Sequence, residues 1–196
     1  MQQRELDLVG LPPHPSAWVV ANPAAGRPNR KSRAYTAVGT LAEAGWTLSW
    51  RSTRGPGHAA ELACRAAREG IDIVVVVGGD GTVNEVANGL AGSDCALALL
   101  PAGTGNVLAA QLGLLAVPTS LHVPDPVGAA RRLAAGRIRS VDLGHARARG
   151  KGGRHFVLWA GVGLDAEIVR RVEGESRSWK RSMGPVAYAA IGVRSL

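Results

Sequence analysis

The sequence predicts an α/β fold with a parallel sheet, followed by the start of a β-rich, sandwich-like second domain that is truncated. Over residues 17–136, short apolar runs alternate with segments in which apolar residues recur at helical spacing, as in the units of a parallel sheet. From residue 137, two short strand patterns flank a glycine-rich turn, which is typical of an antiparallel hairpin. We therefore expect a disordered lead-in over residues 1–16, an α/β domain over 17–136 and an incomplete β-rich domain over 137–196.

The first strand is expected at residues 17–21, and helical spacing predicts a helix over 29–44 that Gly45 ends. Cationic side chains crowd the start of this helix, where they are unfavourable for the helix itself. They indicate either an anionic partner or a solvated surface. The residues concerned are Arg27, Arg30, Lys31 and Arg33.

A second strand is expected at residues 46–51, a loop at 52–58 and then a helix that Gly70 ends. His58 lies at the start of this helix. There it could meet a phosphate group, or it could cap the helix and pack locally.

Residues 74–77 are four consecutive valines and predict a strand that is buried on both faces. A turn with three glycines and one carboxylate follows, and Thr82 is expected to cap the next helix. A strand, a glycine turn and a helix N-terminus together suit a phosphate group. Asp80 would repel that phosphate unless it holds a metal ion or accepts a proton. The alternative is a tight turn in which Asp80 serves the turn geometry alone.

Residues 96–100 predict another buried strand, and the glycine-containing loop 101–106 follows it. Thr104 or Asn106 is expected to cap a further helix that reaches Leu115. Four strands therefore end in loops rich in glycine and polar side chains. In a parallel sheet these loops meet at one edge, which is where α/β domains bind their ligands.

The charge, the aromatic content and the cysteine count limit the classes of function that this chain can have. The chain has 196 residues and a net charge of +8, of which residues 137–196 carry +7, from 12 Lys and Arg against 5 Asp and Glu. This asymmetry suits an anionic membrane surface, a phosphorylated ligand or nucleic acid, or it is a solvated basic face. An aromatic content of 4% argues against nucleic acid as the partner.

The two cysteines are too few for a disulfide framework. No signal peptide or spanning run is evident, so we expect a cytoplasmic protein, peripheral at the inner membrane.

Four motifs in order resemble the lipid kinase superfamily that includes diacylglycerol and sphingosine kinases, and within it the bacterial diacylglycerol kinase-like proteins. GGDG alone would be weak evidence, since NAD kinases and phosphofructokinases share it. The resemblance covers essentially residues 17–196. The motifs are Asn22-Pro23-Ala24-Ala25-Gly26, Gly57-His58-Ala59, the GGDGTVNEVANGL stretch that starts at Gly78, and Pro101-Ala102-Gly103-Thr104-Gly105-Asn106.

The resemblance implies an ATP site between an α/β domain and a β-sandwich domain, with Mg²⁺-dependent phosphoryl transfer to a lipid hydroxyl, most of all that of diacylglycerol. It implies catalytic roles for Asp80 and for Asp165, which would face the acceptor. The metal ligands and the formation of a homodimer stay open. The residues expected at the nucleotide are Asn22, Thr53, Gly78, Gly79, Gly81, Thr82, Glu85, Gly103, Thr104, Asn106, Lys180 and Arg181.

Two departures from the family pattern bear on catalysis. Val107 stands where many relatives have Asp, and a late [D/E]GE motif is missing, because Glu173-Gly174-Glu175 comes too early in the chain. An alternative is therefore a truncated nucleotide-binding protein without catalysis. NAD kinase is a second alternative, which the Asn22 loop and the 101–106 motif oppose.

Overall fold

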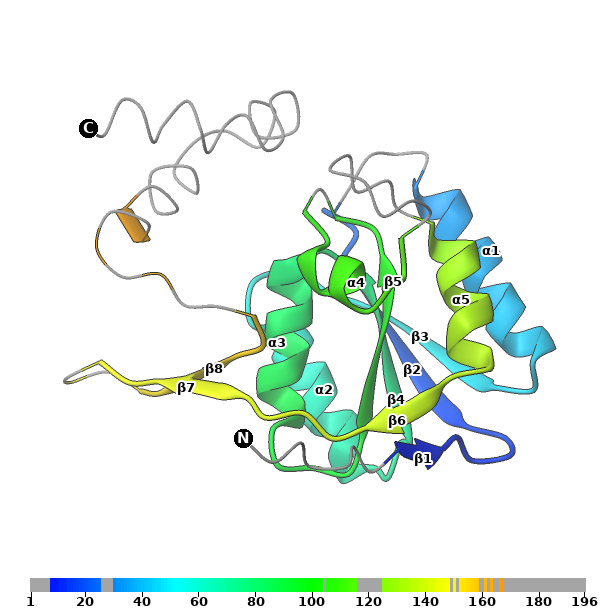
Figure 1. The fold of residues 1–196 in the computed structure, drawn as a ribbon, viewed down its shortest axis with the longest axis horizontal. Coiled ribbons are helices and arrows are strands. Elements are labelled where there is room, and N and C mark those ends of the chain that lie inside the picture. Colours follow the sequence, from blue (N-terminus) through cyan, green and yellow to red (C-terminus); the bar gives the residue numbers. More distant parts are fainter. Residues whose placement is uncertain are drawn as a thin grey trace. The chain divides into compact units, whose positions relative to one another are not determined.

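The fold is built on a four-stranded parallel sheet in the order β3-β2-β4-β5 (Figure 1). Its strands are β2 (Ser16–Ala21), β3 (Thr47–Ser52), β4 (Ile73–Gly78) and β5 (Ala96–Pro101). The predicted α/β class is confirmed. The structure is a computed structural model, and it describes residues 8–25, 30–103, 105–115, 125–148, 150, 152–158, 161, 163 and 166–167.

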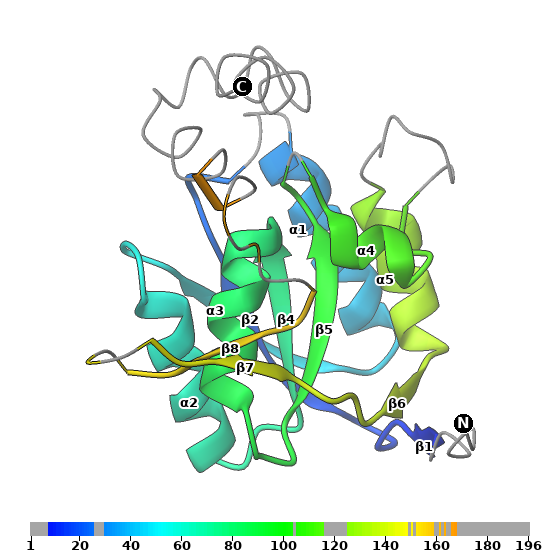
Figure 2. The same cartoon turned by 60° about the vertical axis from the view of Figure 1, so that its left-hand side comes forward.

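Helices cover both faces of this sheet (Figures 1 and 2). Helices α1 (Arg30–Glu43) and α5 (Pro126–Ala134) pack on one face, and α2 (His58–Arg68) and α3 (Asp80–Leu90) on the other. Every residue of β4 is buried, as expected for the middle of a sheet that is covered on both sides.

Helix α4 (Val107–Gln111) is shorter than the sequence pattern predicts. The next glycine, Gly113, has a φ of +68°, which takes the chain out of the helix. Its N–H donates to the carbonyl of Ala110, and the N–H of Leu114 donates to that of Ala109. These bonds satisfy two of the last carbonyls of α4, and the helix therefore ends before Leu115.

Helices α2 and α3 approach so closely that a side chain is excluded at Gly89. A Cβ atom there would collide with the carbonyl oxygen of Ala60. It would also lie 2.8 Å from Cβ of Ala63 and 3.0 Å from the backbone nitrogen of Cys64. None of these groups can rotate away, so the contact between the helices requires glycine at this position.

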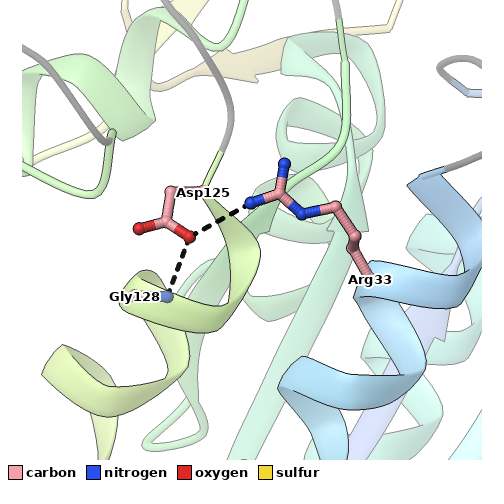
Figure 3. A network of polar contacts seen from close by, with 3 residues as sticks. All are labelled: Arg33, Asp125 and Gly128. Carbon is pink, nitrogen blue, oxygen red and sulfur yellow. Dashed lines mark hydrogen bonds and ion pairs between the residues drawn. The ribbon is translucent and has the colours of Figure 1, made fainter.

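On the other face, α1 and α5 are joined by a polar contact (Figure 3). Asp125 caps α5 by accepting a hydrogen bond from the N–H of Gly128 at 3.1 Å. The same carboxylate oxygen lies 3.5 Å from the guanidinium of Arg33 on α1. Arg33, one of the four cations at the start of the first helix, therefore has a structural partner.

The start of β2 is fixed by Asp72, which directly precedes β4. Its carboxylate accepts hydrogen bonds from the backbone N–H of Ser16 at 2.8 Å and from the Ser16 hydroxyl at 2.7 Å. The hydroxyl bond, and then the backbone bond, hold the pKa of the Asp72 carboxyl below its ordinary value of 3.8. The ionised form is therefore the one that the fold stabilises.

Because the pKa of Asp72 is lower in the folded chain than in the unfolded chain, its contribution is complete above the unfolded pKa. That contribution is lost as the pH falls through the folded pKa. We expect the free energy of unfolding of the wild type to exceed that of Asp72→Asn at about pH 7, with the gap closing towards about pH 3. Urea unfolding of both proteins across this range measures the gap. A gap that stays constant with pH would contradict the assignment.

Residues 8–10 differ from the disordered lead-in that the sequence predicts. They form β1 (Leu8–Gly10), which pairs antiparallel with β6 (Arg137–Arg139). The two partners are far apart in the sequence, so no local pattern announces the pairing. Apolar residues at Ile138, Val141 and Leu143 predict a single strand, but two short strands form instead. Strand β6 pairs with β1, whereas β7 (Gly144–Ala146) pairs with β8 (Arg154–Phe156).

The hairpin β7–β8 is antiparallel, and it falls in the same compact unit as the sheet. This unit ends at Val157, whereas the sequence analysis places the boundary after residue 136. Of the unit Leu158–Leu196 the structure describes only a few residues, among which the N–H of Glu167 donates to the carbonyl of Gly163, as in a helical turn. A β-rich domain beyond Val157 stays a prediction.

Candidate functional site

The loops at the carboxyl ends of the four parallel strands meet at one edge, as the sequence predicts. Backbone hydrogen bonds continue the ladder past the strands and hold the loops in register. Asn22 N–H donates to Val77 at 3.0 Å, and Thr53 N–H donates to Ala21 at 2.8 Å. Ala102 N–H donates to Gly78 at 3.0 Å.

Asn22 joins the first loop to helix α3. Its Oδ1 accepts a hydrogen bond from the N–H of Ala24 at 2.9 Å, which closes a tight turn. Its Nδ2 donates to Oγ1 of Thr82 at 3.1 Å. Thr82 is therefore not the helix cap that the sequence predicts: α3 starts at Asp80, and Gly79 occupies the cap position. The Thr82 side chain instead lies over Gly78, where a Cβ atom would come within 2.7 Å of it.

The third and fourth loops touch through two glycines. A Cβ atom on Gly103 would collide with Cα of Gly79, and one on Gly79 would lie 3.1 Å from Cα of Gly103. The buried amide of Asn106 fixes the shape of the fourth loop. It accepts a bond from the N–H of Gly103 at 2.9 Å and donates one to the carbonyl of the same residue at 2.8 Å. Asn106 holds the cap position of α4, but its side chain makes no capping bond to the helix.

Asp80 also reaches from α3 to α4. Its Oδ1 accepts a hydrogen bond from the N–H of Val107 at 2.8 Å. Its Oδ2 lies where a Cβ atom on Gly105 would come within 2.6 Å. The carboxylate therefore holds the start of α4 in place, through the backbone of the residue at which this chain departs from the family pattern.

Above the first turn of α3 the surface is open. A Cβ atom on Gly81 would meet nothing within 4 Å. The first bond of the helix runs from the N–H of Val83 to the carbonyl of Gly79, so the preceding N–H groups lie outside the helical ladder. With the positive end of the helix dipole, these groups suit an anion such as phosphate.

Glu85 and His58 both hold the start of α2. Oε2 of Glu85 accepts a hydrogen bond from the N–H of Ala59 at 3.2 Å, and Nδ1 of His58 accepts one from the N–H of Arg54 at 3.0 Å. These bonds satisfy backbone groups at and before a helix start. His58 thus makes a local contact to the preceding loop rather than a cap, since Gly57 holds the cap position of α2. Glu85 has a structural contact whether or not it also meets a nucleotide.

Beside Asn22 lies a cavity of about 150 Å³ that sequence reasoning missed. Two of its walls are Tyr35 of α1 and Trp50 of β3, whose rings stack with centroids 4.7 Å apart. The indole N–H of Trp50 donates to the hydroxyl of Ser52 at 3.1 Å. Because α1 and β3 meet only in the folded chain, no local motif could have identified this cavity.

Four predicted site residues lie outside the described part of the chain: Thr104, Asp165, Lys180 and Arg181. Among the residues that are described, no group of three or more His, Cys, Asp or Glu side chains comes together. No described helix has the length and apolar character needed to cross a bilayer. Both cysteines are free thiols. Burial, with a smaller effect of the Asp72 charge, raises the pKa of Cys95 to about 11.

Comparisons with known proteins agree with this architecture. The chain is 32% identical over 182 residues to the diacylglycerol kinase of Bacillus subtilis, covering 92% of this chain and 55% of that protein. It is 33% identical over 165 residues to a Pseudomonas putida protein named "Probable lipid kinase YegS-like", covering 81% and 48%. A crystal structure of a diacylglycerol kinase from Bacillus anthracis matches with a TM-score of 0.50 and 27% identity, over 68% of this chain and 41% of that one.

The chain thus spans about half the length of the curated relatives that it matches. Residues 16–146 match the family described as the diacylglycerol kinase catalytic domain, and this range contains the sheet and all four loops at its carboxyl edge. The chain belongs to the diacylglycerol kinase catalytic domain family.

Proposed function

We propose that this chain carries the nucleotide-binding part of an ATP-dependent lipid kinase, which transfers the γ-phosphate of ATP to a lipid hydroxyl, that of diacylglycerol or a related lipid. The observation that carries the proposal is the open N-terminus of α3, flanked by the Asn22 loop on one side and the Gly103 loop on the other. Membership of the family supports ATP as the nucleotide.

In this proposal the protein acts by positioning and by charge, since phosphoryl transfer needs little covalent chemistry from the enzyme. The backbone N–H groups at the start of α3 bind phosphate oxygens, and Gly81 lets those oxygens approach the backbone. Mg²⁺, when bound with the nucleotide, neutralises charge on the phosphates, and the Asp80 carboxylate is of the ligand type that it prefers. Asp165, Lys180 and Arg181 keep their predicted roles at the acceptor and the phosphates.

The experiment combines binding and turnover. A fluorescent ATP analogue measures nucleotide affinity, and ATP labelled at the γ-phosphate measures transfer to diacylglycerol in mixed micelles with an anionic lipid. Asp80→Asn keeps the oxygen that accepts from Val107 but removes the charge. We expect its folding to be unchanged and its transfer rate to fall by about 100-fold or more. A variant that transfers phosphate at the wild-type rate would contradict the role of Asp80.

The two alternatives give different results in the same assay. ATP binding without transfer to any lipid would favour a nucleotide-binding protein without catalysis. Labelled phosphate that appears on NAD but on no lipid would favour NAD kinase. Micelles without anionic lipid test whether the basic charge of residues 137–196 contributes to activity.

A further inference from the structure

Two histidines face each other on the hairpin formed by β7 and β8, outside the site described above. In the antiparallel register His145 lies directly opposite His155. The centroids of their imidazole rings are 4.8 Å apart, with 43° between the ring planes. Within the described part of the chain neither ring forms a hydrogen bond or an ion pair, so their nitrogens are available to a ligand.

A contact from α3 shows why the rings are so close. The Asn88 side chain accepts a hydrogen bond from the N–H of His155 and donates one to its carbonyl, both at 2.8 Å. These backbone groups therefore point away from β7, which makes the histidines a non-hydrogen-bonded pair of the ladder. In such pairs the side chains of the two strands approach each other most closely.

The absence of a side chain at Gly153 leaves space for the ring of His145. A Cβ atom on Gly153 would collide with the imidazole of His145, so the ring leans across a position that has no side chain. The neighbouring pair is Gly144 and Phe156, and a Cβ atom on Gly144 would collide with the Phe156 ring. Because successive side chains of a strand point to opposite faces, Phe156 occupies the face away from the histidines.

We propose that His145 and His155 together bind a divalent transition metal ion, Cu²⁺, Ni²⁺ or Zn²⁺, with two imidazole ligands and water in the remaining positions. Imidazole suits these ions, and Cu²⁺ should bind most tightly in the general order of affinities. Mg²⁺ and Ca²⁺ prefer oxygen ligands and should not compete. The bound ion links β7 to β8, and the Asn88 contact extends this link to α3.

The test uses the whole chain without a polyhistidine tag. Isothermal titration with Ni²⁺ or Zn²⁺, and the electron paramagnetic resonance spectrum of added Cu²⁺, should show one ion with nitrogen ligands per chain. His145→Ala and His155→Ala should each weaken binding by about tenfold or more, since only one imidazole remains. The control His14→Ala removes an exposed histidine elsewhere and should bind like the wild type.

A composition-matched variant separates the pair from the number of histidines. His145→Ala combined with Ala146→His moves the imidazole to the opposite face of the hairpin. It should bind as weakly as His145→Ala alone, while circular dichroism without metal shows an unchanged fold. Wild-type affinity in this variant, a loss of binding in His14→Ala, or no binding by the wild type would each overturn the proposal.

Discussion

Gly89→Ala is expected to lower the free energy of unfolding by about 3 kcal/mol, within the upper range for overpacking a well-filled contact. The added methyl group would collide with the carbonyl oxygen of Ala60 and press on Cβ of Ala63. Neither atom can move without shifting α2, so the two helices must separate along their whole contact. Urea unfolding monitored by circular dichroism measures the change.

Gly39→Ala is the matched control, because Gly39 also lies inside a helix. It is exposed on α1, and a Cβ atom there would meet nothing within 4 Å. Alanine should therefore stabilise the protein by about 0.5–1 kcal/mol through helix propensity alone. If both substitutions shifted stability in the same direction, the steric account of Gly89 would be wrong.

Gly103→Ala is expected to weaken nucleotide binding by about 100-fold, the scale on which a displacement of about 1 Å affects a positioned site. The methyl group would collide with Cα of Gly79, and neither loop can rotate a side chain away because both contact atoms belong to backbone. The two loops must therefore separate at the point where the proposed phosphate site lies. Titration with a fluorescent ATP analogue measures the affinity.

Gly81→Ala distinguishes the ligand from the fold. A Cβ atom there touches no protein atom within 4 Å, so the melting temperature should not fall. If phosphate groups lie against this turn of α3, the methyl group nevertheless meets them and the affinity drops. Wild-type affinity in both glycine variants would mean that nucleotide binds elsewhere.

Sequence patterns were sufficient for the sheet and for the edge that carries the loops. The valine run predicts β4 because a strand covered on both faces needs apolar side chains at every position. The glycines after β4 and β5 predict the loops, since the backbones of these two loops must approach each other closely. These patterns contain local information only, namely the spacing of the apolar residues and the residues that interrupt it. They therefore predict strands, helices and loops.

The polar contacts of the site could not be predicted in the same way. Asp80 bonds to the backbone of a residue 27 positions later, and Glu85 to one 26 positions earlier. Both partners are backbone N–H groups, which every residue other than proline possesses, so the sequence carries no signal for them. For the same reason the sequence predicts helix-capping bonds for Thr82 and Asn106, whose side chains instead contact Asn22 and Gly103. A capping bond joins residues that are close in the sequence, so a sequence pattern can predict it.

The side chain of Asn88 also has a consequence for how separate molecules behave. Its amide occupies the outward N–H and C=O of His155, the groups through which a strand from another molecule would add to β8. A polar residue on a helix thus substitutes for a neighbouring strand. We therefore expect substitutions of Asn88 to increase light scattering at high protein concentration before they lower the stability of the fold. The reason is that an uncovered strand edge promotes aggregation.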